Sequence, residues 1–422
     1  MKRPNYAFSR VMYIIEVALE YFISMMIGGA YLAKIAGEIG LSDSTTGVLT
    51  SFVSLGLGFQ IFALFLRNKT PVKRWVSILH IVNQCFFALV WLTPLFPLSG
   101  TGKTVLFIGF LLIGHVLCNV ITPSKVNWLM SLVDDRKRGV FTANKEIVSL
   151  ISGMIFSYVM GALYDFFEAK GETVPALIIG GITIFGLMIL HTVTLLLSDE
   201  KPTPKSEKTS LRTLFSDRRQ VKSIFLVIGV NVLWAVAHYI TTPFYGTYQV
   251  KELGFSMTFV SVLGILYAVA RSAVSRLLGK FADRHSFASM LNICFVVVAV
   301  AFGVNVFTVP ENGKVFFTIY YVLFAVAMAG INSSAINLIY DYVEPQKRTV
   351  ALAFSQSISG IVGFLATYFA GFLVEWIQEN GLVVFGRNIY AQQVMSLLGV
   401  VCVLIALLYT NLAVRKLPKK SA

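Results

Sequence analysis

The chain has 422 residues, of which 56% are hydrophobic and only 13% are charged. This composition excludes a soluble globular protein, because so few charged groups could not cover the surface of so long a chain. The formal net charge of +14 comes from residues between apolar runs, so it does not indicate nucleic-acid binding. Because the sequence contains no nucleotide-binding loop and no metal-ligand spacing, we expect no enzyme, no cofactor and no metal.

Twelve apolar runs follow one another along the chain, and each is about long enough to cross a hydrocarbon core of roughly 30 Å. Runs of this length are typical of helices and not of the shorter strands of a barrel. We expect the glycine pairs inside them, Gly28-Gly29 and Gly180-Gly181, to serve helix packing. The sequence therefore predicts an all-α integral membrane protein. The expected spans are 11–36, 45–66, 75–97, 104–130, 140–165, 176–197, 221–246, 257–277, 287–309, 315–340, 350–377 and 391–412.

Basic residues gather in every second segment between the expected spans. With the N-terminus placed inside the cell, the outer segments carry only Lys103, Lys170, Lys251, Lys314 and Arg387. Because cytoplasmic loops are enriched in Lys and Arg, this asymmetry predicts that both termini are cytoplasmic. The basic inner surface would also meet anionic membrane lipids. From the short loops and termini we expect a monomeric, multi-pass protein of the plasma membrane, such as a bacterial inner membrane.

Two stretches that lie 210 residues apart match each other without an insertion. Val133-Asp-Asp-Arg-Lys-Arg-Gly-Val-Phe-Thr-Ala143 corresponds to Val343-Glu-Pro-Gln-Lys-Arg-Thr-Val-Ala-Leu-Ala353, and the same offset pairs Ser124 with Ser334. This register indicates a duplication, so the two halves should have the same topology. Parallel halves of this kind are typical of one large class of secondary transporters.

The longest hydrophilic stretch lies between the sixth and seventh expected spans. It begins with Ser198-Asp-Glu-Lys-Pro-Thr-Pro and is polar and proline-bearing, which is typical of a linker. We therefore expect an N-terminal six-helix bundle at 1–197, a cytoplasmic linker at 198–220 and a C-terminal six-helix bundle at 221–422. No other loop is long enough to fold alone, so any binding site should lie inside the membrane.

The segment Gly279-Lys-Phe-Ala-Asp283-Arg284 resembles the loop signature G-x-x-x-D-R/K of the major facilitator superfamily. The basic segments that contain Arg138 and Arg348, each opening a helix, resemble that superfamily's second conserved cytoplasmic loop. The signature is partial, because His285 and a serine follow where the family continues with Gly and basic residues. In the first half, the matching loop has lost both the Gly and the Asp.

This resemblance implies two pseudo-symmetric six-helix bundles that move around a site near the membrane midplane by alternating access. It further implies that helices 1, 4, 7 and 10 line the central cavity. Gly279 would permit a tight exit from the eighth span. Asp283 would lie near the N-terminus of the fifth helix and stabilise one transport state, because a carboxylate interacts favourably with a helix N-terminus. Arg284, Arg138 and Arg348 belong to the same group of gating and motif residues.

Charged residues inside the first expected span are candidates for function, because a charge in hydrocarbon costs several kcal/mol. Glu16 and Glu20 are four residues apart and therefore share one helix face. Glu20 lies about 5 Å from the middle of its span, counting 1.5 Å per residue, and is our first candidate for a proton-binding group. Cations at matching depth are Lys125, level with Glu16, and Arg271, near the depth of Glu20. The Glu16–Lys125 pair is the most plausible one, and a purely structural ion pair is the alternative.

Further polar residues lie nearer the middle of the expected spans. His115 and Asn119 share one helix face by their spacing, as do Trp234 and His238. With Asn231 and Asn332 they would suit a polar organic solute, bound by hydrogen bonds and stacking. Each of them alone could equally be an interhelical hydrogen-bonding residue. His115 and His238 also compete with Glu20 for the coupling proton.

These features together predict a secondary transporter that imports a small polar organic solute with protons, that is, a symporter. The absence of a P-loop argues against ATP as the energy source. One alternative is proton-coupled efflux of drugs or metabolites, although the Gly-Pro motif of drug antiporters is missing from the fifth span. Facilitated uniport and a non-transporting membrane sensor on the same fold are the others.

Overall fold

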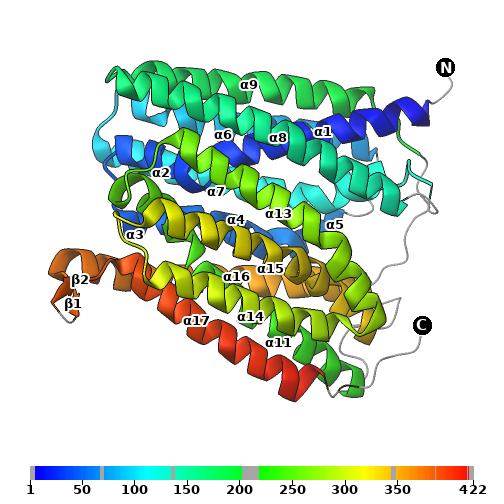
Figure 1. The fold of residues 1–422 in the computed structure, drawn as a ribbon. Coiled ribbons are helices and arrows are strands. Elements are labelled where there is room, and N and C mark those ends of the chain that lie inside the picture. Colours follow the sequence, from blue (N-terminus) through cyan, green and yellow to red (C-terminus); the bar gives the residue numbers. More distant parts are fainter. Residues whose placement is uncertain are drawn as a thin grey trace. The chain divides into compact units, whose positions relative to one another are not determined.

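The computed structural model describes residues 5–66, 71–134, 138–201, 218–343, 348–384, 386–415 and 417. Helices dominate both halves (Figure 1). Those of the first half are α1 (Tyr6–Met26), α2 (Gly29–Glu38), α3 (Asp43–Thr50), α4 (Phe52–Gly58), η1 (Phe59–Phe62), α5 (Ala63–Leu66), α6 (Val72–Leu92), η2 (Thr93–Leu95), α7 (Gly100–Met130), α8 (Arg138–Ala169) and α9 (Thr173–Leu197).

The second half repeats this arrangement of long helices. Its elements are α11 (Arg218–Tyr239), η4 (Thr242–Phe244), α12 (Tyr245–Thr247), η5 (Tyr248–Glu252), α13 (Met257–Arg284), α14 (Phe287–Val306), α15 (Gly313–Tyr342), α16 (Arg348–Asn380), β1 (Val383–Val384), β2 (Arg387–Asn388), α17 (Ala391–Tyr409) and η7 (Thr410–Val414). The strands β1 and β2 pair antiparallel in a small hairpin between α16 and α17.

Within the described residues, eleven helical segments are long and apolar enough to cross a membrane, and the bent pair of α1 and α2 makes a twelfth if it is counted as one span. The prediction of an all-α membrane fold is therefore confirmed. The first span is bent by 45° where α1 ends and α2 begins. Gly29, at this break, has φ of +53°, a conformation that glycine adopts without the strain of a side chain. Our interpretation of Gly28-Gly29 as packing glycines was wrong, because the pair marks the break.

The chain forms two compact units. The first contains residues 1–42, 55–206 and 256–261, and the second contains residues 43–54, 207–255 and 262–422. The predicted division at 198–220 stays a prediction, and residues 202–217 of that linker lie outside the described residues.

In the first unit, α6 packs against α7 and α9, while α1 packs against α8 and α9. Glycines permit close approach here: a methyl group on Gly180 of α9 would lie 2.0 Å from the ring of Trp91 of α6. The prediction that Gly180 serves packing is thus confirmed. Buried side chains from α1, α6, α7, the turn after α7 and α9 form a common core: Tyr13, Val76, Ile121, Trp128, Leu129, Leu132 and Leu195.

In the second unit, α14 packs against α15 and α17, while α11 packs against α16 and α17. The helix α3 belongs to this unit and packs along α16, where Ser44 Oγ donates a hydrogen bond of 2.9 Å to the carbonyl of Gly371. One cluster of its core joins the segment that follows α11 with η4, α16 and α17: Ile240, Phe244, Ala370, Val374, Ile377, Ala391 and Met395.

Candidate functional site

A buried lysine joins the two glutamates of α1. Lys125 Nζ, from α7, lies 2.7 Å from Glu16 Oε1 and 2.5 Å from Glu20 Oε2. The predicted Glu16–Lys125 ion pair is confirmed, and the structure adds Glu20 to it. The spacing of four residues brings both carboxylates to the same side of α1, where one ammonium group can serve both. Glu16 and Lys125 are each only 1% exposed at the side chain, whereas Glu20 is 26% exposed.

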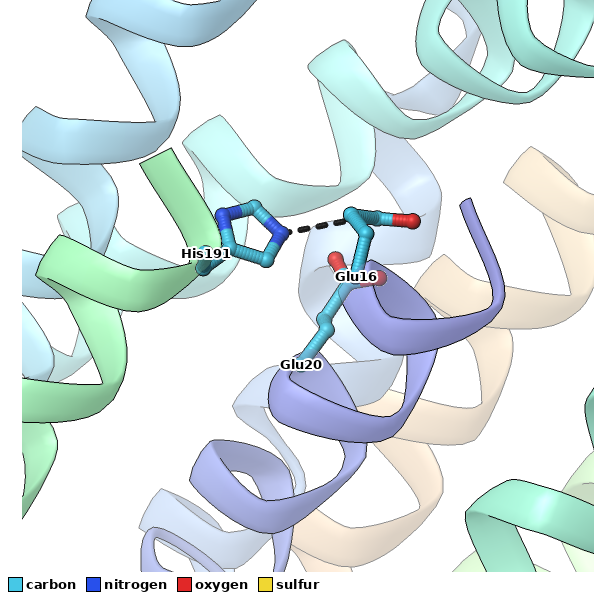
Figure 2. Close-up of side chains that lie close together, drawn as sticks. All are labelled: Glu16, Glu20 and His191. Carbon is cyan, nitrogen blue, oxygen red and sulfur yellow. Dashed lines mark hydrogen bonds and ion pairs between the residues drawn. The ribbon is translucent and has the colours of Figure 1, made fainter. Parts of the chain in front are cut away.

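Two histidines extend this cluster into the interior of the first unit. His191 of α9 has its Nε2 2.9 Å from Glu16 Oε1, and the ring of His80 of α6 lies 5.0 Å from the ring of His191. Figure 2 shows His191 reaching from α9 toward the two glutamates of α1. Several buried polar atoms here have no hydrogen-bond partner among the described residues: Glu16 Oε2, His191 Nδ1 and both ring nitrogens of His80.

The cluster also offers three groups of the kind that bind metal ions. Oxygen and nitrogen atoms of Glu16, Glu20 and His191 lie within 4.8 Å of one another. The ammonium group of Lys125, however, contacts both carboxylates and so takes the position that a cation would need. We therefore treat the cluster as a network of ion pairs.

A second lysine lies at the edge of this network without joining either carboxylate. Lys145 Nζ of α8 is 3.3 Å from the hydroxyl of Tyr13 and 4.7 Å from the centre of its ring. Tyr13 is itself buried on α1, one turn before Glu16. The contact places a positive charge on the face of an aromatic ring, which is a favourable arrangement.

In the second unit, aromatic rings surround His238 of α11. Its ring stacks on Phe324 with centroids 5.9 Å apart and lies 5.4 Å from the ring of Trp234. Thr242 Oγ1 is 3.3 Å from His238 Nε2, whereas the buried Nδ1 has no partner among the described residues. The structure thus brings together Trp234 and His238 as predicted, and it adds Phe324 of α15.

The other polar residues of the predicted site have more local contacts. Asn119 donates to the carbonyl of His115 in the same helix, at 3.0 Å, while the ring of His115 packs against Phe87. Asn231 donates to Ser355 Oγ at 3.0 Å, which joins α11 to α16. These contacts fit the alternative of helix-stabilising hydrogen bonds. Asn332 is an exposed residue of α15.

The motif residues lie near the ends of long helices. α13 continues five residues beyond Gly279, and a methyl group there would meet nothing within 4 Å. The expected tight exit at Gly279 was therefore wrong. Asp283 and Arg284 are exposed in the last turn of α13, and Arg271 lies further back in the same helix. Arg348 begins α16 and donates from Nε to the carbonyl of Val343 at 3.1 Å. Arg138 begins α8, but its side chain lies outside the described residues.

Sequence reasoning missed His80 and His191, although the signal was present. Counted from the middle of the expected spans 75–97 and 176–197, they lie about 9 Å and about 7 Å toward the same side of the membrane as Lys125. The depth count that paired Glu16 with Lys125 would therefore have added both histidines to the group.

Comparison with known proteins identifies the family. A sequence model of the Major Facilitator Superfamily matches residues 15–278 and 227–422. The chain belongs to the major facilitator superfamily. It is a multi-pass membrane transporter and not an enzyme. No curated protein shows significant sequence similarity to it.

Solved structures of other superfamily transporters share the fold over nearly the whole chain. A mutant form of the nucleoside transporter NupG superposes with a TM-score of 0.70 at 15% identity and covers 96% of this chain and 99% of its own. A D-xylose-proton symporter gives 0.72 at 14%, with coverage of 95% and 97%. An auto-inhibited POT family peptide transporter gives 0.72 at 12%, with 97% of both chains covered. At such identities the likeness establishes the superfamily fold alone.

Proposed function

We propose that this transporter imports a small polar organic solute together with protons across the plasma membrane, with both termini in the cytoplasm. Proton coupling requires a group that binds and releases a proton and whose charge affects the rest of the transporter. The cluster of Glu16, Glu20 and Lys125 supplies such a group inside the membrane-spanning part of the first unit.

The observation that carries the proposal is the unequal exposure of two carboxylates that share one lysine. Glu16 is sealed, whereas about a quarter of the Glu20 side chain is exposed. A proton or a positively charged group that reaches Glu20 removes its attraction for Lys125, which then has Glu16 as its remaining partner. The charge state of Glu20 and the position of Lys125 are therefore linked, and such linkage can couple proton binding to a change of state.

The aromatic group around His238 supports a solute with a polar ring. Trp234 and Phe324 offer ring faces for stacking, and the buried Nδ1 of His238 is free of partners among the described residues. Binding sites for small organic molecules commonly combine apolar ring faces with a few polar atoms that set orientation. The symporter for D-xylose and the nucleoside transporter, whose folds this chain shares, are named for solutes of this general kind.

The substrate class is tested first by a thermal-stability screen of the purified protein in detergent. Sugars, organic acids, amines, amino acids, nucleosides and cationic dyes would each be added at pH 5.5 and pH 7.5. A ligand that binds the folded state raises the apparent melting temperature by mass action. A stabilising polar solute with different effects at the two pH values supports the proposal, whereas stabilisation by lipophilic cations alone would favour efflux.

Coupling is tested with the solute that the screen identifies, in proteoliposomes with an internal pH of 7.5. We expect uptake to be faster with an external pH of 5.5 than with 7.5, and Glu20→Gln to lose this stimulation. Glu38→Gln is the matched control, because Glu38 is an exposed carboxylate of α2 outside the cluster. Uptake that is indifferent to the proton gradient in the unmodified protein would indicate uniport instead.

A further inference from the structure

We propose that the coupling proton resides on His191, held there by Glu16, and that Glu20 is the accessible carboxylate through which water or solute reaches this sealed pair. This inference rests on the proposed proton coupling and adds the residue on which the proton is held.

The cluster contains one more negative charge than positive charges when its histidines are neutral. Glu16 and Glu20 face a single ammonium group, that of Lys125. Lys145 acts on the two carboxylates only through space, because its ammonium group contacts Tyr13 and forms no ion pair with either of them. Arg10 Nη1 donates to the carbonyl of Leu132 at 3.2 Å. A buried charge without compensation is costly, so the site favours one additional positive charge. A proton on an imidazole ring supplies it without any other ion.

His191 is the histidine placed to hold that charge. Its Nε2 lies 2.9 Å from Glu16 Oε1, the same oxygen that Lys125 contacts. The ring of His80 lies 5.0 Å from the ring of His191, and neither of its nitrogens forms a hydrogen bond to a carboxylate of the cluster. On α7, the ring of His115 packs against Phe87. A hydrogen bond to a carboxylate stabilises the protonated form of a histidine.

The two carboxylates differ in how much of each side chain is exposed, and this difference assigns them different roles. His191 and Glu16 are 0% and 1% exposed, whereas Glu20 is 26% exposed. The sealed pair can retain a proton while the accessible Glu20 exchanges its contacts with solvent or solute. The buried atoms without partners, His191 Nδ1 and Glu16 Oε2, are costly for stability, and such atoms in a native structure often mark a functional group.

The direct test is a nitrogen-15 NMR titration of the histidine rings in the full-length protein, between pH 8 and pH 5. The chain has only five histidines, so single His→Gln variants assign every signal. We expect the nitrogen-15 signals of the His191 ring to report a protonated ring within this range, and Glu16→Gln to change those signals because the ring loses its carboxylate partner. A His191 ring that stays neutral down to pH 5 in the unmodified protein would overturn the inference.

The transport test uses the solute found by the screen. We expect His191→Gln to abolish accumulation driven by a proton gradient while it retains exchange of labelled for unlabelled solute, which needs no net proton movement. His285→Gln is the control, because this histidine is exposed beyond the end of α13. Gradient-driven accumulation that survives in His191→Gln would refute the inference and leave proton-coupled import intact. A His191 that titrates in a transporter indifferent to the gradient would instead refute the proposed function.

Discussion

Asp165 of α8 caps the first turn of α13 through a hydrogen bond from the backbone N–H of Met257. The distance from this nitrogen to Asp165 Oδ1 is 2.7 Å, and the N–H of Thr258 donates to Oδ2 at 2.8 Å. A carboxylate in this position satisfies two N–H groups that lack partners within the helix and also interacts with the positive end of the helix dipole. The segment 256–261 belongs to the same compact unit as α8, and this cap is one contact that holds it there.

Removal of this cap should weaken the first unit. We expect Asp165→Ala to lower the free energy of unfolding by about 1 kcal/mol, the usual effect of losing a helix cap, and Asp165→Asn to lose less because one oxygen remains. Thermal unfolding of the purified protein in detergent measures both. Glu172→Ala is the matched control, because Glu172 precedes α9 without a capping hydrogen bond from its side chain. Equal effects at the two positions would contradict the assigned role of Asp165.

Lys125→Met should destabilise the protein strongly, because Glu16 and Glu20 would be left without their counter-ion. Breaking a buried ion pair by removal of one partner typically costs about 3–5 kcal/mol. Melting temperatures of the variant and of the unmodified protein in detergent test this. The triple variant Lys125→Met, Glu16→Gln, Glu20→Gln should recover much of the loss, because it leaves no unpaired carboxylate, and failure to do so would argue against the charge explanation.

Gly180→Ala should destabilise the contact between α6 and α9. The added methyl group would lie 2.0 Å from Trp91 Cε3, so the ring or the helix must shift, and overpacking of this kind typically costs about 1–3 kcal/mol. Gly186→Ala, six residues further along α9, meets nothing within 4 Å and should be neutral or slightly stabilising. The difference between the two melting temperatures is the measurement, and a smaller effect at Gly180 than at Gly186 would contradict the packing seen here.

Asp283→Asn should slow uptake of the identified solute about fivefold while it leaves expression unchanged. The superfamily resemblance predicts that this carboxylate stabilises one transport state at a helix N-terminus, an interaction worth about 1 kcal/mol. Arg415→Gln is the control, since Arg415 is an exposed residue beyond η7 and outside the motif. Initial uptake rates of equal amounts of reconstituted protein decide the matter. Unchanged kinetics in Asp283→Asn would remove the basis for a role in the transport cycle.

Depth along the membrane normal could be predicted from the sequence, whereas position around each helix could not. Counting residues from the middle of each span correctly paired Glu16 with Lys125. It could not show that α9 packs against α1, and this packing is what brings His191 to Glu16. Such neighbours depend on side-chain volumes at helix crossings, for example Gly180 against Trp91, which no periodicity reveals.

The break within the first expected span could not be predicted from hydropathy. Residues 11–36 form one apolar run, but the helix breaks after Met26 and resumes at Gly29. Hydropathy measures only the free energy of transferring residues into the membrane, so it contains no information about the backbone conformation of Gly29. The motif at Gly279 was misread for the opposite reason, because glycine permits a turn without requiring one.

The two copies of the predicted duplication differ at the position of the buried lysine. The offset that pairs Ser124 with Ser334 places Ala335 at the position of Lys125. In the first copy, the ammonium group of Lys125 lies between two carboxylates. In the second copy, Ala335 has only a methyl group, and the backbone carbonyl of Ala335 accepts a hydrogen bond from Asn231. In the register of the predicted duplication, this lysine therefore stands in only one of the two copies. The two matching halves of this single chain therefore differ in chemistry, because only the first can hold a buried positive charge at this position.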